Sequence, residues 1–215
     1  MVFQFPFLSL RPNSNMENKN QFLEKATELF IEHGSKTLTM DDVAREFGIS
    51  KKTLYQKYKN KEALLEEVLD FKLNHIIQKM QKLDVEVENA VERMFCRDEQ
   101  MERAVNSNRS MMVKQLVKYY PSIFNKHMVN FSEKFSQVLM NNILKGREQG
   151  YYRDDFNEEV YSKLFVLLMM SYDSSPILEY ERVEREDFNY EVMMLYMNAI
   201  TTEKGKEILK KINKK

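Results

Sequence analysis

The chain has 215 residues, of which 43% are hydrophobic and 31% are charged, which predicts a globular protein long enough to bury a substantial core. Its 33 basic and 33 acidic residues balance, so a polyanion can be bound only where basic side chains gather on one surface. Because only 5 Gly and 4 Pro are present, turns are few, which favours long helices over strands. Together with the helical patterns described below, we expect an all-α fold of about nine helices.

The cysteine content and the hydropathy of the chain indicate where in the cell the protein is expected. The single cysteine, Cys96, cannot form an internal disulfide and is compatible with a reducing cytoplasm. The longest apolar run, Leu164 to Met170, is much shorter than the roughly 20 residues of a membrane span. We therefore expect a cytoplasmic location and no membrane partner.

The first residues, 1–16, are apolar at first and then rich in Pro and Asn. No basic residue precedes the apolar run and no small-residue cleavage site follows it, which argues against a signal peptide. We expect either a disordered leader or an upstream start, with Met16 as the natural initiator.

From about Asn18 to His33 the apolar residues follow the spacing of a helix, and Gly34 is a suitable C-terminal stop. The apolar positions are Phe22, Ala26, Leu29 and Phe30. This first helix is expected to pack behind the next two and complete a three-helix unit.

Residues 39–61, TMDDVAREFGISKKTLYQKYKNK, predict two short helices joined by a tight turn. Thr39 is a plausible N-cap of the first helix, and Gly48 stands where the chain needs a residue free to adopt positive φ. Ser50 can cap the second helix, in which Leu54 and Tyr58 are expected to face the core. This arrangement is a helix-turn-helix.

The rest of the second helix is basic and polar, and no acid occurs between Ser50 and Lys61. This face consists of Lys51, Lys52, Thr53, Gln56 and Lys57, with Tyr55 beside it. Such a face suits a polyanion, although a merely solvated charged surface is the alternative for any single helix.

The order Thr-x-x-x-Val-Ala-x-x-x-Gly-Ile-Ser-Lys-x-Thr-Leu-Tyr-x-x-Tyr-x-x-Lys-Glu-x-Leu, from Thr39 to Leu64, resembles the DNA-binding region of the TetR family of bacterial regulators. The resemblance implies a helix-turn-helix DNA-binding domain over residues 17–62 and a helical regulatory and dimerisation domain over residues 63–215. It implies a transcription regulator, most often a repressor. Lys52 is a departure, because the family usually carries a small residue there.

A helix-turn-helix enters the major groove with the N-terminal part of its second helix. We therefore predict that Lys51 and Lys52 contact base edges, preferably of guanine, and that Gln56 contacts adenine. The resemblance implies that DNA phosphates are bound by Thr39, Thr53, Tyr55, Lys57 and Lys61. The N-cap Ser50 completes the predicted DNA-binding set, and double-stranded operator DNA is the expected partner.

Two helices are expected to begin near Asn157 and near Arg185, and the first is apolar on two faces, which indicates an interface with a second copy of the chain. One face carries Val160, Leu164, Leu167 and Leu168, and the other carries Tyr161, Phe165, Met169 and Tyr172. One monomer core usually covers only one such face, which predicts a homodimer built on a four-helix bundle. We assign the dimer interface to Tyr161, Phe165, Met169, Tyr172, Val192 and Tyr196.

The resemblance also implies a cavity among the middle helices, where a small, largely apolar effector would bind. The candidate lining residues are Phe95, Met112, Tyr120, Phe124, His127, Met169 and Tyr172. Met and aromatic side chains adapt well to apolar ligands. The same residues suit an ordinary core, and that alternative stays open.

Enzymatic chemistry finds little support in the sequence. The 3 His and the single Cys show no metal-ligand spacing, and no glycine-rich phosphate loop is present. We expect no cofactor and no bound metal.

Two hypotheses about function follow from the sequence as a whole. The first is a dimeric repressor that a ligand releases from a palindromic operator. The second is a DNA-bound protein that acts through a protein partner without a small-molecule inducer.

Overall fold

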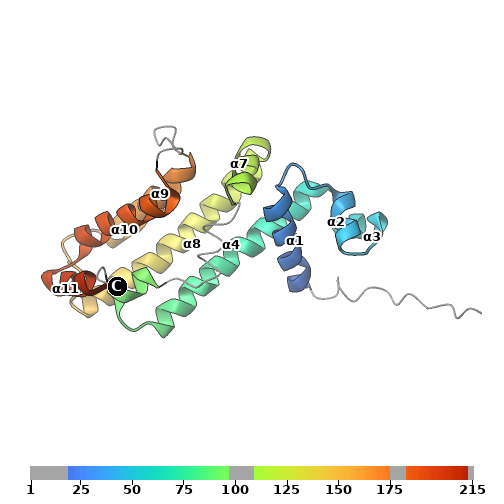
Figure 1. The fold of residues 1–215 in the computed structure, drawn as a ribbon. Coiled ribbons are helices and arrows are strands. Elements are labelled where there is room, and N and C mark those ends of the chain that lie inside the picture. Colours follow the sequence, from blue (N-terminus) through green and yellow to red (C-terminus); the bar gives the residue numbers. More distant parts are fainter. Residues whose placement is uncertain (1–18, 97–108, 175–182, 213–215) are drawn as a thin grey trace, which may run out of the picture.

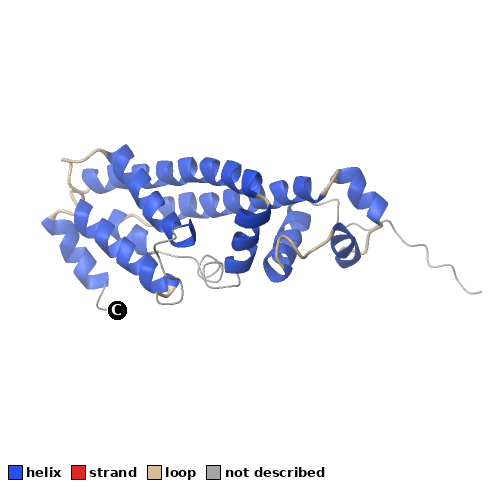
Figure 2. Ribbon diagram, turned by 90° about the horizontal axis from the view of Figure 1, so that it is seen from above, coloured by secondary structure: helices blue, strands red, loops and turns tan. Residues whose placement is uncertain are grey.

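The protein is all-α over the part that the computed structural model describes, residues 19–96, 109–174 and 183–212 (Figure 1 and Figure 2). Ten helices and no β-strand are present in these ranges, which confirms the predicted fold class with one helix more than expected. The predicted leader, residues 1–16, lies outside the described residues.

The helices are α1 (Lys19–His33), α2 (Met40–Glu46), α3 (Lys51–Lys57), α4 (Lys61–Glu86), α5 (Ala90–Phe95), α7 (Arg109–Tyr119), α8 (Pro121–Glu148), α9 (Glu158–Ser174), α10 (Arg185–Ile200) and α11 (Glu203–Ile212). The molecule is elongated, with α1, α2 and α3 at one end and α9, α10 and α11 towards the other (Figure 1). The two longest helices, α4 and α8, pack side by side and connect the ends.

Within the described ranges, none of the helices has the length and apolar character that a membrane crossing requires.

An N-terminal core holds α1, α2 and α3 together, and its members reach beyond these three helices. Leu64 and Leu65 of α4 are fully buried in it, and α7 contributes Met112 and Leu116. The predicted domain boundary between residues 62 and 63 therefore runs through a continuous apolar core. The helix-turn-helix is supported by the start of α4 and by α7.

A separate C-terminal core is formed by α5, α8, α9, α10 and α11. Phe165 of α9 lies against the Tyr196 ring of α10, with a distance of 4.6 Å between ring centroids. It also meets the Phe135 ring of α8 edge to face at 6.3 Å. Aromatic pairs at such separations add to the stabilisation from their buried area.

This packing speaks against the predicted dimer interface, because four of the six residues chosen for it are buried within the chain itself. Phe165, Val192 and Tyr196 are buried in the C-terminal core, and Tyr172 is buried as well. Tyr161 and Met169 are half-buried against the same core. The opposite apolar face of α9 is the exposed one, and it carries Val160, Leu164 and Leu167.

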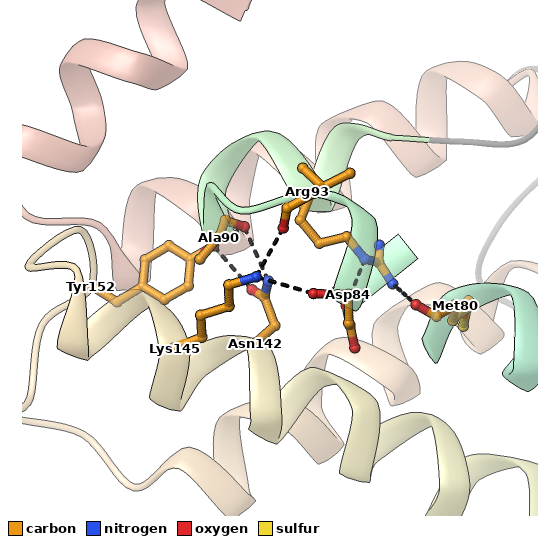
Figure 3. A network of polar contacts seen from close by, with 8 residues as sticks. Met80, Asp84, Ala90, Arg93, Asn142, Lys145 and Tyr152 are labelled. Carbon is orange, nitrogen blue, oxygen red and sulfur yellow. Dashed lines mark hydrogen bonds and ion pairs between the residues drawn. The ribbon is translucent and has the colours of Figure 1, made fainter. Parts of the chain in front are cut away.

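A buried polar network joins the end of α4 to α5 and α8 (Figure 3). The Tyr152 hydroxyl donates to the Ala90 carbonyl at 2.9 Å, and the Asn142 amide donates to the same oxygen at 3.1 Å. The Lys145 ammonium donates to the carbonyls of Asp84 and Val87 at 3.0 and 2.8 Å. The Lys145 bonds satisfy backbone oxygens at the end of α4, which would otherwise cost free energy when shielded from water, and the bonds to Ala90 tie α5 to α8.

Arg93 of α5 completes the network. Its Nε forms an ion pair with Asp84 Oδ1, and its Nη2 donates to the Met80 carbonyl at 2.7 Å (Figure 3). Only a small part of the Arg93 side chain is exposed. Burial raises the pKa of the Asp84 carboxyl above its ordinary value, although the neighbouring Arg93 opposes that rise.

Candidate nucleic-acid interface

Helix α2 begins with a complete capping box. The Asp42 amide donates to Thr39 Oγ1 at 3.1 Å, and the Thr39 amide donates to Asp42 Oδ2 at 3.0 Å. The Thr39 hydroxyl also donates to this carboxylate at 2.6 Å, and these hydrogen bonds lower the pKa of Asp42. Thr39 therefore fixes the start of α2, while its predicted phosphate contact stays a prediction.

The turn between α2 and α3 has the local chemistry that the sequence predicts. Gly48 has φ +63°, a conformation that side-chain-bearing residues rarely adopt. The Ser50 hydroxyl accepts a hydrogen bond from the Thr53 amide at 3.0 Å and caps α3. It also lies 2.7 Å from the Thr53 hydroxyl. Ser50 and Thr53 thus shape the beginning of the candidate reading helix.

Two buried side chains set the orientation of α3. Leu54 is fully buried, and the Tyr58 ring stacks on Phe22 of α1 with 5.7 Å between centroids, which confirms the predicted core role of Tyr58. Because successive helical residues are rotated by about 100°, Lys52 and Gln56 lie on the side opposite this pair. Both are exposed, so the outermost surface of α3 is cationic and polar.

Lys51 and Lys57 lie on the two flanks of α3 rather than on its outermost surface. Lys51 forms an ion pair with Asp41 of α2, with Nζ 2.8 Å from Oδ1. The Lys57 ammonium lies 4.9 Å from the centroid of the Phe22 ring, on the α1 side. Tyr55 is also exposed, and the centroid of its ring lies 5.9 Å from the Lys51 ammonium. The sequence pattern did not reveal the Asp41 contact, because it joins residues of two different helices.

Lys61, in the first turn of α4, is directed at the backbone between α1 and α2. Its ammonium donates to the Lys36 carbonyl at 2.8 Å, and partial burial lowers its pKa. An ammonium has three N–H donors, so the predicted phosphate contact by Lys61 is compatible with this hydrogen bond and stays a prediction.

Helix α7 also contacts the turn between α1 and α2. The Lys36 amide donates to Gln115 Oε1 at 2.7 Å, and the buried Ser35 hydroxyl donates to the Met112 carbonyl at 3.4 Å. Gly34 has φ +82°, and a Cβ at this position would lie 2.5 Å from Gln115 Oε1. The α1–α2 turn therefore depends on a close approach by α7, which couples the helix-turn-helix to the rest of the chain.

The seven candidate effector residues divide between the two cores instead of forming one group. Met112, Tyr120 and Phe124 belong to the N-terminal core or pack against it. Phe95 and Met169 pack against the C-terminal core. Tyr172 is buried against the Phe188 ring of α10. His127 is buried on α8, where burial lowers its pKa and Asp70 of α4 lies 3.9 Å from its Nδ1.

The helix-turn-helix region is similar in sequence to known bacterial regulators. A family model described as bacterial regulatory proteins, tetR family, matches residues 22–68. The chain is 38% identical over 65 residues to YhgD of Bacillus subtilis (strain 168), named as an HTH-type transcriptional regulator. It is 31% identical over 72 residues to the HTH-type transcriptional repressor KstR2 of Mycolicibacterium smegmatis. These alignments cover 30% and 34% of this chain and only 34% and 35% of the two relatives, so the chain spans about a third of their length.

The likeness in fold extends further than the likeness in sequence. A TetR transcription regulator from Haloarcula marismortui superposes with a TM-score of 0.68, covering 87% of this chain and all of that one, at 16% sequence identity. At this level of identity the match concerns the fold alone. Residues 22–68, which hold the capped helix-turn-helix, therefore match the tetR family of bacterial regulatory proteins, and the chain shares the all-α fold of a TetR transcription regulator.

Proposed function

We propose that this protein regulates transcription by binding operator DNA through α3. The observation that carries the proposal is the orientation of α3, in which Lys52 and Gln56 lie outward while Leu54 and Tyr58 are buried. Lysine can donate to the acceptors of guanine, and glutamine can bind adenine through two hydrogen bonds. The N-cap at Ser50 fixes the start of the helix that would enter the major groove.

We further propose that the protein acts as a two-fold homodimer. The exposed apolar stripe on α9 formed by Val160, Leu164 and Leu167 supports this assembly, and Leu195 of α10 is 64% exposed. Large apolar side chains gathered on one face mark an interaction surface. Two α3 helices on a two-fold dimer would read a palindrome, which multiplies the discrimination of each short helix.

Repression relieved by a small, largely apolar effector is our proposal for control. The hydrogen bond and close contact between Gln115 of α7 and the α1–α2 turn support this proposal, because a displacement of α7 would be transmitted to the helix-turn-helix. An effector can do this only if it binds the two states with different affinities. A melting screen against lipophilic compounds, repeated with operator DNA, tests this. If compounds that stabilise the protein never weaken operator binding, a protein partner becomes the better hypothesis.

Lys52→Ala is expected to weaken operator binding at least about tenfold, because a base contact by lysine is lost in each half-site. The loss should be larger on the operator than on random DNA, since a pure phosphate contact would weaken both equally. Fluorescence anisotropy with labelled duplexes at several salt concentrations measures both affinities.

Lys210→Ala is the matched control, since it removes the same charge from an exposed position on α11, far from α3 (Figure 1). It should leave operator binding unchanged. Equal losses for the two variants, or no loss for Lys52→Ala, would contradict the assignment of α3 as the reading helix.

A further inference from the structure

The edge of the α3 surface carries an acid that the DNA-binding hypothesis does not require. Lys51 is the first residue of α3, and its ammonium lies 2.8 Å from Oδ1 and 3.0 Å from Oδ2 of Asp41 in the first turn of α2. Asp41 is not the capping acid, because that role belongs to Asp42. The carboxylate of Asp41 is thus directed at α3, and it raises the pKa of the Lys51 ammonium.

This contact puts DNA and Asp41 in competition for one cation. Because Lys51 lies on the flank of α3 beside Asp41, its position favours a phosphate contact over the base contact predicted from the sequence. A DNA phosphate is the same kind of partner for Lys51 as the Asp41 carboxylate, namely an anionic oxygen group. Both side chains of the pair are 60% exposed, so the pair is open to solvent and exchangeable rather than locked. A lysine already neutralised by a carboxylate adds less to the counterion release that drives DNA binding.

We infer that Asp41 limits the affinity of this protein for DNA by competing with phosphate for Lys51. The inference rests on the proposed function, since it concerns the same α3 surface. It predicts a penalty that is independent of base sequence and greatest at low salt, where phosphate contacts contribute most. Asp41 therefore lowers non-specific binding, and the relative weight of the base contacts by Lys52 and Gln56 rises.

Binding of the full-length protein to a random-sequence duplex, measured over a series of salt concentrations, tests this inference. Asp41→Asn should raise the affinity about threefold to tenfold at low salt and steepen the dependence of log K on log salt by about one unit, the value for one additional phosphate contact. Asp41→Ser, which also suits a first helical turn, serves as a second variant. Glu46→Gln removes the same charge from an exposed position at the end of α2 and should give a smaller effect.

The same substitution made in a Lys51→Ala background separates competition from simple repulsion between Asp41 and DNA. Competition requires that most of the gain from Asp41→Asn disappear when Lys51 is absent. A gain of equal size in both backgrounds, or no gain with wild-type Lys51, overturns the inference. If the unsubstituted protein bound neither random nor selected DNA, the proposed function itself would fail, which is a different outcome.

Discussion

Leu167→Glu is expected to leave the protein monomeric and to lower its affinity for a palindromic operator by at least roughly a hundredfold, because the two half-sites would no longer be bound as one event. Leu167 is 65% exposed on the apolar stripe of α9. A carboxylate buried in a two-fold interface would face its own copy and lose its hydration, and both effects oppose association.

Sedimentation equilibrium would measure the oligomeric state, and anisotropy with an operator duplex would measure the affinity. Val85→Glu provides the control, since Val85 is 85% exposed but lies on α4, outside the stripe. It should remain dimeric and bind normally. A Leu167→Glu protein that stays dimeric and binds with unchanged affinity would show that the stripe is not the interface.

Arg93→Ala is expected to lower the free energy of unfolding by about 3 kcal/mol, because it leaves the Asp84 carboxylate without its charge partner in a largely buried site. It also removes the donor to the Met80 carbonyl. Urea unfolding followed by circular dichroism measures this change. Arg153→Ala removes an arginine from an exposed ion pair with Asp155 and should cost less than about 1 kcal/mol for that contact.

The loss of unfolding free energy in Arg93→Ala should depend on pH, and the sign of that dependence follows from the pKa of Asp84. Burial raises the pKa of Asp84 in the folded protein, and removal of Arg93 should raise it further. The folded state then binds a proton more readily than the unfolded state, so stability falls as pH rises through the folded-state pKa. The deficit of Arg93→Ala should therefore be smaller at mildly acidic pH than at neutral pH. Equal stability losses for the Arg93 and Arg153 variants would contradict the structural role of this network.

The helix-turn-helix could be predicted because its determinants are local. Thr39 and Ser50 as N-caps, Gly48 at positive φ, and Leu54 with Tyr58 as the buried pair all act within a few residues of sequence. Capping, backbone conformation and helical periodicity depend little on the rest of the chain. For this reason the predicted starts of α2 and α3, at the N-caps Thr39 and Ser50, agree with the structure.

The exposed apolar face of α9, on which we place the proposed interface, could not be predicted in the same way. Helical periodicity shows that Leu164 and Phe165 lie on different apolar faces, but both faces are hydrophobic. Which face meets α8 and α10 depends on how the aromatic rings of Phe165, Phe135 and Tyr196 pack together. That packing joins distant parts of the sequence, so it became visible only in three dimensions.

The partners of the charged residues on α3 likewise could not be predicted from the sequence. From the sequence we assign Lys51 and Lys52 to base edges and Lys57 to a phosphate, whereas in the structure Lys51 pairs with Asp41 and Lys57 lies over the Phe22 ring. Lys52 and Gln56 remain the outermost pair. The functional weight we assign to Lys52 therefore rests on its position in the folded helix as well as on its residue type.

Selection of bound sequences from a random duplex library with the purified full-length protein tests most directly the claim that two α3 helices read DNA as a symmetric pair. We predict enrichment of a palindrome whose two inverted half-sites are each read by Lys52 and Gln56, and loss of that enrichment in a protein carrying Lys52→Ala together with Gln56→Ala. Failure of the wild-type protein to enrich any sequence, or enrichment of a single asymmetric site that the double variant still selects, would contradict the account.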